Sequence, residues 1–246
     1  MTRWKAAGIH LAASTVVTAA ALLAPMLLWY HFDMWPLSGL GPALAGLFLA
    51  VLLAGPGLTL MAYRAGKKTL RLDLVVIVLI QVAFLSYACF MLSRIRPVFL
   101  VAAGDHLVLV RAMDIDRGDL ADAGIDPHAL SWTGPRLVGL QVPGFEARDL
   151  LAAGVYARQY PEQPAFYIAY GRSAPTLLAN ASPVAATAAR TARDQATITD
   201  ALASLGRVES QVRAIPVSSR AGRATMLVDA GNGRPLRALP LELAGD

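Results

Sequence analysis

The stretch LVVIVLIQVAFLSYACFML, which occupies residues 74–92, decides the fold of this chain. It contains no Lys, Arg, Asp or Glu. A helix needs about 20 residues to cross a hydrocarbon core of about 30 Å, and this run is close to that length. Because a helix satisfies its own backbone hydrogen bonds, it is the form in which a single apolar segment can cross lipid. The stretch therefore predicts a transmembrane helix.

Two earlier runs, residues 6–30 and 39–63, are longer still and also lack charged residues. The first could be the apolar core of a cleaved signal peptide, but it is too long and ends in Trp29-Tyr30, a pair typical of the membrane interface. We interpret it as a retained anchor. Only 16% of the 246 residues are charged, against about 25% in an average soluble domain. Residues 1–96 are therefore expected to form an α-helical membrane bundle of three transmembrane helices.

Basic residues flank the predicted spans unevenly. Six of them precede the first span or lie between the second and third: Arg3, Lys5, Arg64, Lys67, Lys68 and Arg71. The loop between the first two spans has none, and only Arg94 and Arg96 follow the third. Cytoplasmic loops carry the excess of Lys and Arg, so the N-terminus is expected in the cytoplasm. The C-terminal part is then periplasmic, if the membrane is a bacterial inner membrane.

The charges of the two parts of the chain differ. Residues 1–96 hold 8 Lys or Arg and 2 acidic residues, whereas residues 97–246 hold 14 Arg and 15 acidic residues. The basic character thus belongs to the membrane flanks, where the lipid bilayer is the expected partner and nucleic acid is not. The single cysteine, Cys89, lies inside the third span, so no disulfide is expected in the outer part.

Residues 97–246 are expected to form a periplasmic α+β domain. Two β-rich runs separated by Gly104-Asp105 predict a hairpin. Further strands are predicted at 137–142, 212–217, 225–229 and 235–239, and helices at 116–123 and 146–153. Ser182-Pro183 is typical of a helix N-cap and first position, and it predicts an Ala-rich helix that runs to about Leu205 and ends at Gly206.

No pattern of catalytic, cofactor or metal chemistry occurs in the sequence. None of the four histidines lies at metal-ligand spacing from another, and CxxC, HExxH and Gly-rich phosphate loops are missing. The acidic run from Asp114 to Asp122 lacks the Gly and Glu of a calcium loop, so a solvated helix start is the better interpretation. The sequence therefore predicts no enzyme, no metal and no cofactor.

Polar residues inside the spans are costly in lipid unless they have partners. His10, Ser14 and Thr18 recur every four residues, so they share one face of the first helix. We interpret the Ser and Thr residues as partners of neighbouring helices in the same bundle. For Gln81, which lies deep in the third span, an internal partner and a foreign one are both open.

Small residues form a stripe along the second span. They are Gly39, Ala43, Gly46, Ala50 and Ala54. Such a stripe lets another helix approach closely, and that helix can belong to the same bundle or to a foreign protein.

The membrane part of the sequence resembles the type IV pilin accessory family (TfpX/TfpZ-type). The matching motifs are, in order, Gly8-Ile9-His10-Leu11, Trp29-Tyr30, Gly55-Pro56, Leu58-Thr59-Leu60, Gly66-Lys67-Lys68, Asp73-Leu74, Gln81, Tyr87 and Arg96-Pro97-Val98. They cover most of residues 8–100. The chain departs from the family pattern near Val51, where members carry an acidic residue, and at Gly57, where they carry Leu.

The resemblance implies an inner-membrane accessory or chaperone protein that binds and stabilises a cognate type IV pilin before assembly. In this interpretation the second and third spans hold the hydrophobic helix of the pilin. The expected contact residues are Ala43, Gly46, Ala50, Ala54 and Gln81. The alternative is a membrane-anchored periplasmic sensor or scaffold subunit that binds a different partner.

The short loop between the second and third spans carries a further group of charged residues. Lys67, Lys68, Arg71 and Asp73 are expected to fix this cytoplasmic turn rather than to perform chemistry. Asp73 lies at the start of the third helix, where a carboxylate suits the positive end of the helix dipole.

Overall fold

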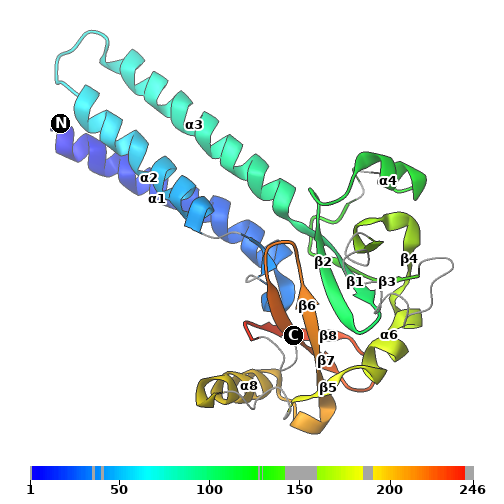
Figure 1. The fold of residues 1–246 in the computed structure, drawn as a ribbon. Helices are drawn as coiled ribbons and strands as arrows, with labels where there is room; N and C mark the ends of the chain where they lie inside the picture. The colour runs from blue at the N-terminus through cyan, green and yellow to red at the C-terminus, as the bar shows by residue number, and fades with distance from the viewer. Residues whose placement is uncertain are drawn as a thin grey trace. The chain divides into compact units, whose positions relative to one another are not determined.

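The computed structural model describes residues 2–34, 37–39, 42–126, 128, 130–141, 160–184 and 191–241. The chain divides into two compact units (Figure 1). Unit 1 consists of Met1–Leu27 and Leu40–Arg94, and unit 2 consists of Leu28–Gly39 and Ile95–Asp246. The short connection between the first two helices therefore belongs to unit 2 rather than to unit 1.

Unit 1 is built from three helices: α1 (Arg3–Trp29), α2 (Pro42–Ala62) and α3 (Leu70–Ile95). Helices α1 and α3 are long and apolar enough to cross a membrane. Only 12% and 11% of their most apolar windows is buried inside the protein, so neither resembles the core helix of a soluble domain. In α2 the described apolar segment, Phe48–Ala62, is shorter. Two of the three predicted spans thus have the length and composition of membrane helices, and the third stays a prediction.

Unit 2 contains a mixed sheet of eight strands in the order β4-β3-β1-β2-β6-β7-β8, with β5 beside β6. The strands are β1 (Pro97–Ala103), β2 (His106–Arg111), β3 (Arg136–Leu140), β4 (Tyr167–Ala169), β5 (Ser182–Pro183), β6 (Val212–Ser218), β7 (Arg223–Asp229) and β8 (Pro235–Leu239). The pairs β1–β3 and β2–β6 are parallel, and the other pairs are antiparallel. Every residue of β1 is buried, as expected for an apolar strand in the middle of a sheet.

Among the described residues, the helices that accompany the sheet include α4 (Arg117–Asp122), α6 (Tyr170–Ala179) and α8 (Ala192–Leu205). One apolar core lies around β1 and β3, and a second is formed by α8 with β6, β7 and β8. The Tyr170 hydroxyl at the start of α6 donates to the Gly233 carbonyl in the β7–β8 turn, and burial raises the pKa of this phenol to about 12. The α+β class predicted for residues 97–246 is confirmed.

Most of the predicted elements of unit 2 are confirmed. The hairpin around Gly104 is β1–β2, the helix predicted at 116–123 is α4, and the strands predicted at 137–142, 212–217, 225–229 and 235–239 are β3, β6, β7 and β8. The helix predicted at 146–153 lies outside the described residues. Helix α6 was not predicted, because Gly171 and Pro175 lie inside it.

The Ala-rich helix predicted to run from Ser182-Pro183 to about Leu205 is not continuous: Ser182 and Pro183 are extended, Val184 is helical, and Thr191 lies outside the helices. Ser182 and Pro183 pair with β6 as strand β5. Helix α8 begins instead after Thr191, whose side chain accepts a hydrogen bond from the Asp194 N–H, and it ends as predicted at Gly206, which has a φ of 61°. Ser-Pro is equally compatible with an extended segment, and here the backbone hydrogen bonds of β6 decide the outcome.

The loop Leu28–Gly39 is an integral part of unit 2. Met34 and Leu37 are fully buried there. The Ser219 hydroxyl, from the β6–β7 turn, donates to the Leu37 carbonyl at 2.8 Å, and Asp33 forms an ion pair with Arg237 of β8 at 2.6 Å. The fold of the outer unit therefore uses a segment that precedes it by about 60 residues in the chain.

We expect Leu37→Ala to destabilise unit 2 by about 2–5 kcal/mol, because it removes a fully buried side chain and leaves a cavity. Asp33→Asn in the same loop should change stability by about 1 kcal/mol or less, since the ion pair that it breaks is largely exposed. Asparagine also tolerates the positive φ of 55° at this position. Chemical unfolding of the full chain in detergent, followed by tryptophan fluorescence, measures both. Equal midpoints for the two variants would show that the loop is not part of the core.

Candidate functional site

A polar cluster joins the three helices of unit 1. It consists of His10 and Ser14 from α1, Thr59 from α2 and Gln81 from α3. The Nδ1 atom of His10 lies 2.6 Å from the Thr59 hydroxyl, and its Nε2 atom lies 2.6 Å from Oε1 of Gln81. The Gln81 Nε2 group donates to Ser14 Oγ at 2.7 Å and to the Val51 carbonyl at 3.3 Å.

The Val51 carbonyl fixes the direction of these hydrogen bonds. A carbonyl oxygen can only accept, so the amide nitrogen of Gln81 must face it, and the amide oxygen must face His10. The Nε2 atom of His10 then carries the hydrogen that is donated to Gln81. In the neutral imidazole the Nδ1 atom therefore accepts from the Thr59 hydroxyl. Both N–H groups of the Gln81 amide and both ring nitrogens of His10 are used inside the bundle.

Gly55 makes room for this cluster. A Cβ atom added at Gly55 would lie 2.1 Å from Gln81 Oε1 and 3.0 Å from His10 Nε2. The backbone of α2 thus passes directly against the Gln81 amide, and a Cβ atom at this position would force that amide to move. Pro56 follows within the helix and has no N–H group, so the backbone of α2 is locally short of one donor here. The carbonyl that loses its i+4 donor is that of Leu52, whereas the Gln81 amide donates to the neighbouring carbonyl of Val51.

The internal interpretation of the polar residues is confirmed for Ser14 and Thr59. Ser14 and Thr59 are buried and bond to side chains of other helices, and Thr18 is buried on the same face of α1 as Ser14. Gln81 also has its hydrogen bonds inside the bundle. The signal for this arrangement in the sequence is the four-residue spacing from His10 to Thr18, but nothing in the sequence pairs that face with Gly55.

The small-residue stripe of α2 faces the other way. Gly46, Ala50 and Ala54 are exposed, and a Cβ atom at Gly46 would meet nothing within 4 Å. Ala43 lies in α2, but its side chain is outside the described part of the chain. The buried face of α2 is formed by other residues, namely Phe48, Val51, Gly55, Pro56 and Thr59. The structure therefore does not bring Gln81 together with the stripe, although the two were predicted to form one contact surface.

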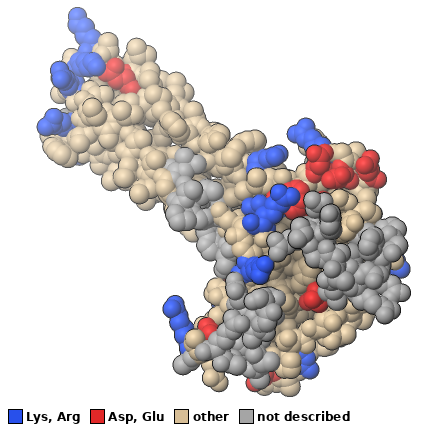
Figure 2. Space-filling model, viewed as in Figure 1, with Lys and Arg blue, Asp and Glu red and all other residues tan. Residues whose placement is uncertain are grey.

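The turn between α2 and α3 is charged, as its sequence predicts. Lys67 donates to the Asp73 carboxylate, and Asp73 lies in the first turn of α3. Lys68 and Arg71 are exposed. Figure 2 shows Lys and Arg side chains gathered at one end of the helical unit, while the rest of its visible surface is almost free of charge. This geometry fits a structural ion pair at a helix start.

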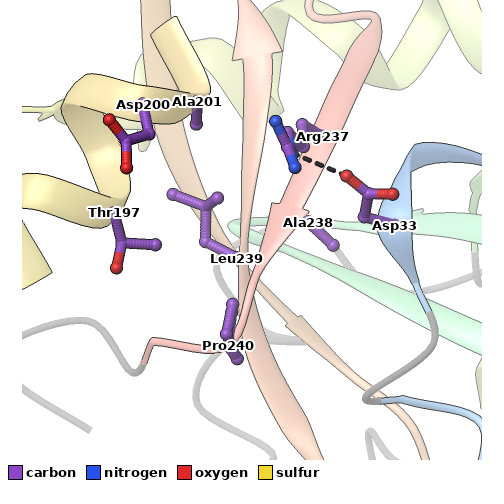
Figure 3. Close-up of a pocket in the computed structure, with 8 residues that line it drawn as sticks. All are labelled: Asp33, Thr197, Asp200, Ala201, Arg237, Ala238, Leu239 and Pro240. Atoms are coloured by element: carbon purple, nitrogen blue, oxygen red, sulfur yellow. Dashed lines mark ion pairs between the residues drawn. The ribbon is translucent and has the colours of Figure 1, made fainter. Parts of the chain in front are cut away.

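Unit 2 has an open hollow of about 440 Å³ between η1 (His31–Asp33), α8 and β8 (Figure 3). Asp33 and Arg237 face each other as an ion pair, and Asp200 and Thr197 project from α8 on the opposite side. The remaining lining is apolar and comes from Ala201, Ala238, Leu239 and Pro240. Two carboxylates and one guanidinium give the hollow a formal charge of −1. The sequence did not reveal it, because its charged residues come from three distant segments.

The described residues contain no group of three or more His, Cys, Asp or Glu side chains that could hold a metal ion. Comparisons with protein-family models, with curated proteins and with solved structures find no match for this chain. A functional assignment therefore rests on the geometry within each unit and on the resemblance seen in the sequence.

Gly55→Ala should destabilise the helical unit by about 1–3 kcal/mol, because the new methyl group overlaps the Gln81 amide and must displace it from His10. Gly57→Ala is the matched control, since a Cβ atom there meets nothing within 4 Å. It should leave stability unchanged or raise it slightly, because alanine favours helix. Loss of helical circular dichroism during titration of detergent micelles with dodecyl sulfate measures both variants. Equal effects at the two glycines would contradict the close contact at Gln81.

Proposed function

We propose that this chain is an inner-membrane accessory protein that binds and stabilises a cognate type IV pilin before assembly. Three helices of unit 1 span the bilayer with the N-terminus in the cytoplasm, and unit 2 lies in the periplasm. The observation that carries the proposal is the exposed small-residue face of α2, formed by Gly46, Ala50 and Ala54. The choice of a type IV pilin as the partner comes from the resemblance of residues 8–100 to the type IV pilin accessory family.

The physics of helix association in lipid supports this use of the α2 face. Lipid tails are as apolar as side chains, so no hydrophobic drive pulls two helices together. Close packing at small residues is then the main source of affinity, and the face of α2 has such residues without internal neighbours at Gly46. Because the hydrogen bonds of Gln81 are made within the bundle, we assign the contact with the pilin's transmembrane helix to α2 and not to Gln81.

The second candidate is a membrane-anchored sensor or scaffold subunit that binds a different partner. The observation in its favour is the hollow of unit 2, in which Asp33, Asp200 and Arg237 meet over an apolar floor. Such a site suits a basic segment of a periplasmic protein. The connection between α2 and α3 is only a few residues long, so it leaves little room there for a cytoplasmic output module.

Reporter fusions test the topology. An enzyme that is active only in the periplasm should be active when fused after Asp246 and silent when fused after Lys68, because six of the eight basic flanking residues lie on the predicted cytoplasmic side. A cytoplasm-specific reporter at the same two positions should give the opposite pattern. Activity of the periplasmic reporter after Lys68 would overturn the orientation.

Gly46→Leu tests the contact with pilin. The added side chain keeps a partner helix away from the α2 backbone, so we expect pilin recovered with the purified protein to fall about tenfold or more, equivalent to about 1.4 kcal/mol. The matched control is Gly8→Leu in α1, where a Cβ atom also meets nothing within 4 Å. Both proteins should be equally abundant in the membrane, and only Gly46→Leu should lose pilin. Unchanged recovery with Gly46→Leu would move recognition to unit 2.

A further inference from the structure

All three chain connections between the helical segments and unit 2 lie at one end of the sheet. Ile95 is followed directly by β1, whose first residue, Pro97, pairs with Arg111 at the end of β2. Gly39 lies against Arg111 and Ala221, since a Cβ atom on it would come within 3.3 Å of an Arg111 guanidinium nitrogen. If α1, α2 and α3 cross a bilayer, chain continuity alone places this end of unit 2 beside the membrane.

Trp29, the last residue of α1, meets a second tryptophan at the same end. The rings of Trp29 and Trp132 lie 6.0 Å apart. Trp132 also contacts Arg96, whose guanidinium carbon lies 3.9 Å from the ring centre and whose Nε donates to the Ser131 carbonyl at 3.1 Å. Trp29 is buried, whereas Trp132 remains 50% exposed.

The exposed apolar side chains of unit 2 concentrate at this end. Among its described residues the large apolar side chains that are exposed are Leu28, Met113, Trp132 and Val208. Leu28 is next to Trp29, Met113 follows the end of β2, and Trp132 precedes β3, which begins beside Phe99 of β1. Val208 is the exception. Val208 lies just before the start of β6. Because Leu107 pairs with Val217 in the parallel register, that start lies about 30 Å along the strands from Arg111, at the opposite end of the sheet.

We propose that this end of unit 2 is a phospholipid-binding surface that rests in the headgroup region of the outer leaflet, with Trp132 as its anchor. Tryptophan favours that region because its ring is apolar and its indole N–H is a hydrogen-bond donor. Arg96 is the positioning residue, since its stacking and its bond to Ser131 fix the angle of the indole ring. The inference rests on the proposed membrane location of unit 1.

Spin labels on single cysteines test this inference in the full chain, reconstituted into liposomes of phosphatidylethanolamine and phosphatidylglycerol. The native Cys89, exposed on α3, reports on the helical unit. The variants Cys89→Ser with Thr133→Cys and Cys89→Ser with Val208→Cys report on the two ends of unit 2, and both positions are exposed. Power saturation compares collisions with oxygen, which concentrates in lipid, and with a water-soluble nickel chelate.

We expect the label at position 89 to read as bilayer interior, the label at 133 as the headgroup region and the label at 208 as water. Adding Trp132→Ser to the Thr133→Cys variant should raise its collisions with the nickel chelate several-fold, and Trp132→Tyr should restore the original value. Circular dichroism confirms that each variant is folded.

Failure of the inference is distinguishable from failure of the membrane location. Water-like values at 133 and 208, with position 89 in the bilayer, would refute the lipid contact and leave unit 1 in the membrane. A label at 133 that is shielded from both reagents would indicate a protein partner and also refute it. A water-like value at position 89 would remove the membrane location and this inference together.

Discussion

The contact of the Gln81 amide with the α2 backbone at Gly55 is the constraint on which unit 1 depends. Helices in lipid are held by close packing and by hydrogen bonds, and this single contact provides both. It also fixes the rotation of α2 about its axis. Once Gly55 and Thr59 face inward, the positions of Gly46, Ala50 and Ala54 must face outward, because they lie on another side of the same helix. The network that closes the bundle therefore also presents the small-residue face.

A second constraint comes from the loop Leu28–Gly39, which belongs to the outer unit although helices precede and follow it. Its buried residues tie the exit of α1 to the same end of the sheet as the exit of α3. This explains Arg96, which runs against the positive-inside rule when it is counted as a membrane flank. The structure gives it a role in folding, since it stacks on Trp132 and bonds to the Ser131 carbonyl. Its charge therefore carries no information on topology.

The sequence predicts elements well where a pattern is local. The β1–β2 hairpin, α4, the end of α8 at Gly206 and the strands near the C-terminus follow from alternation, capping residues and turn glycines. Prediction from the sequence fails where the structure of a segment depends on contacts with residues far away in the chain. Ser182-Pro183 becomes a strand because β6 offers a partner, and the loop around Leu37 becomes core because Ser219 and β8 cover it. The same limit applies to Gln81, whose partners lie 30 to 71 residues away in the chain.

Under the proposed function, the inward direction of the polar side chains of unit 1 limits how well the α2 face can distinguish between partner helices. A partner helix on the α2 face meets Gly46, Ala50 and Ala54, which offer no polar side chain, so it is bound by shape alone. Many apolar helices with small residues satisfy that condition, and such a face distinguishes poorly between them. Discrimination between pilins must then come from unit 2, where charge can be matched. The hollow formed by Asp33, Asp200 and Arg237 is a candidate for this role, because it combines both charge signs with an apolar floor. Under the proposed function, unit 1 would supply affinity for the class of partner, and unit 2 would supply the choice within it.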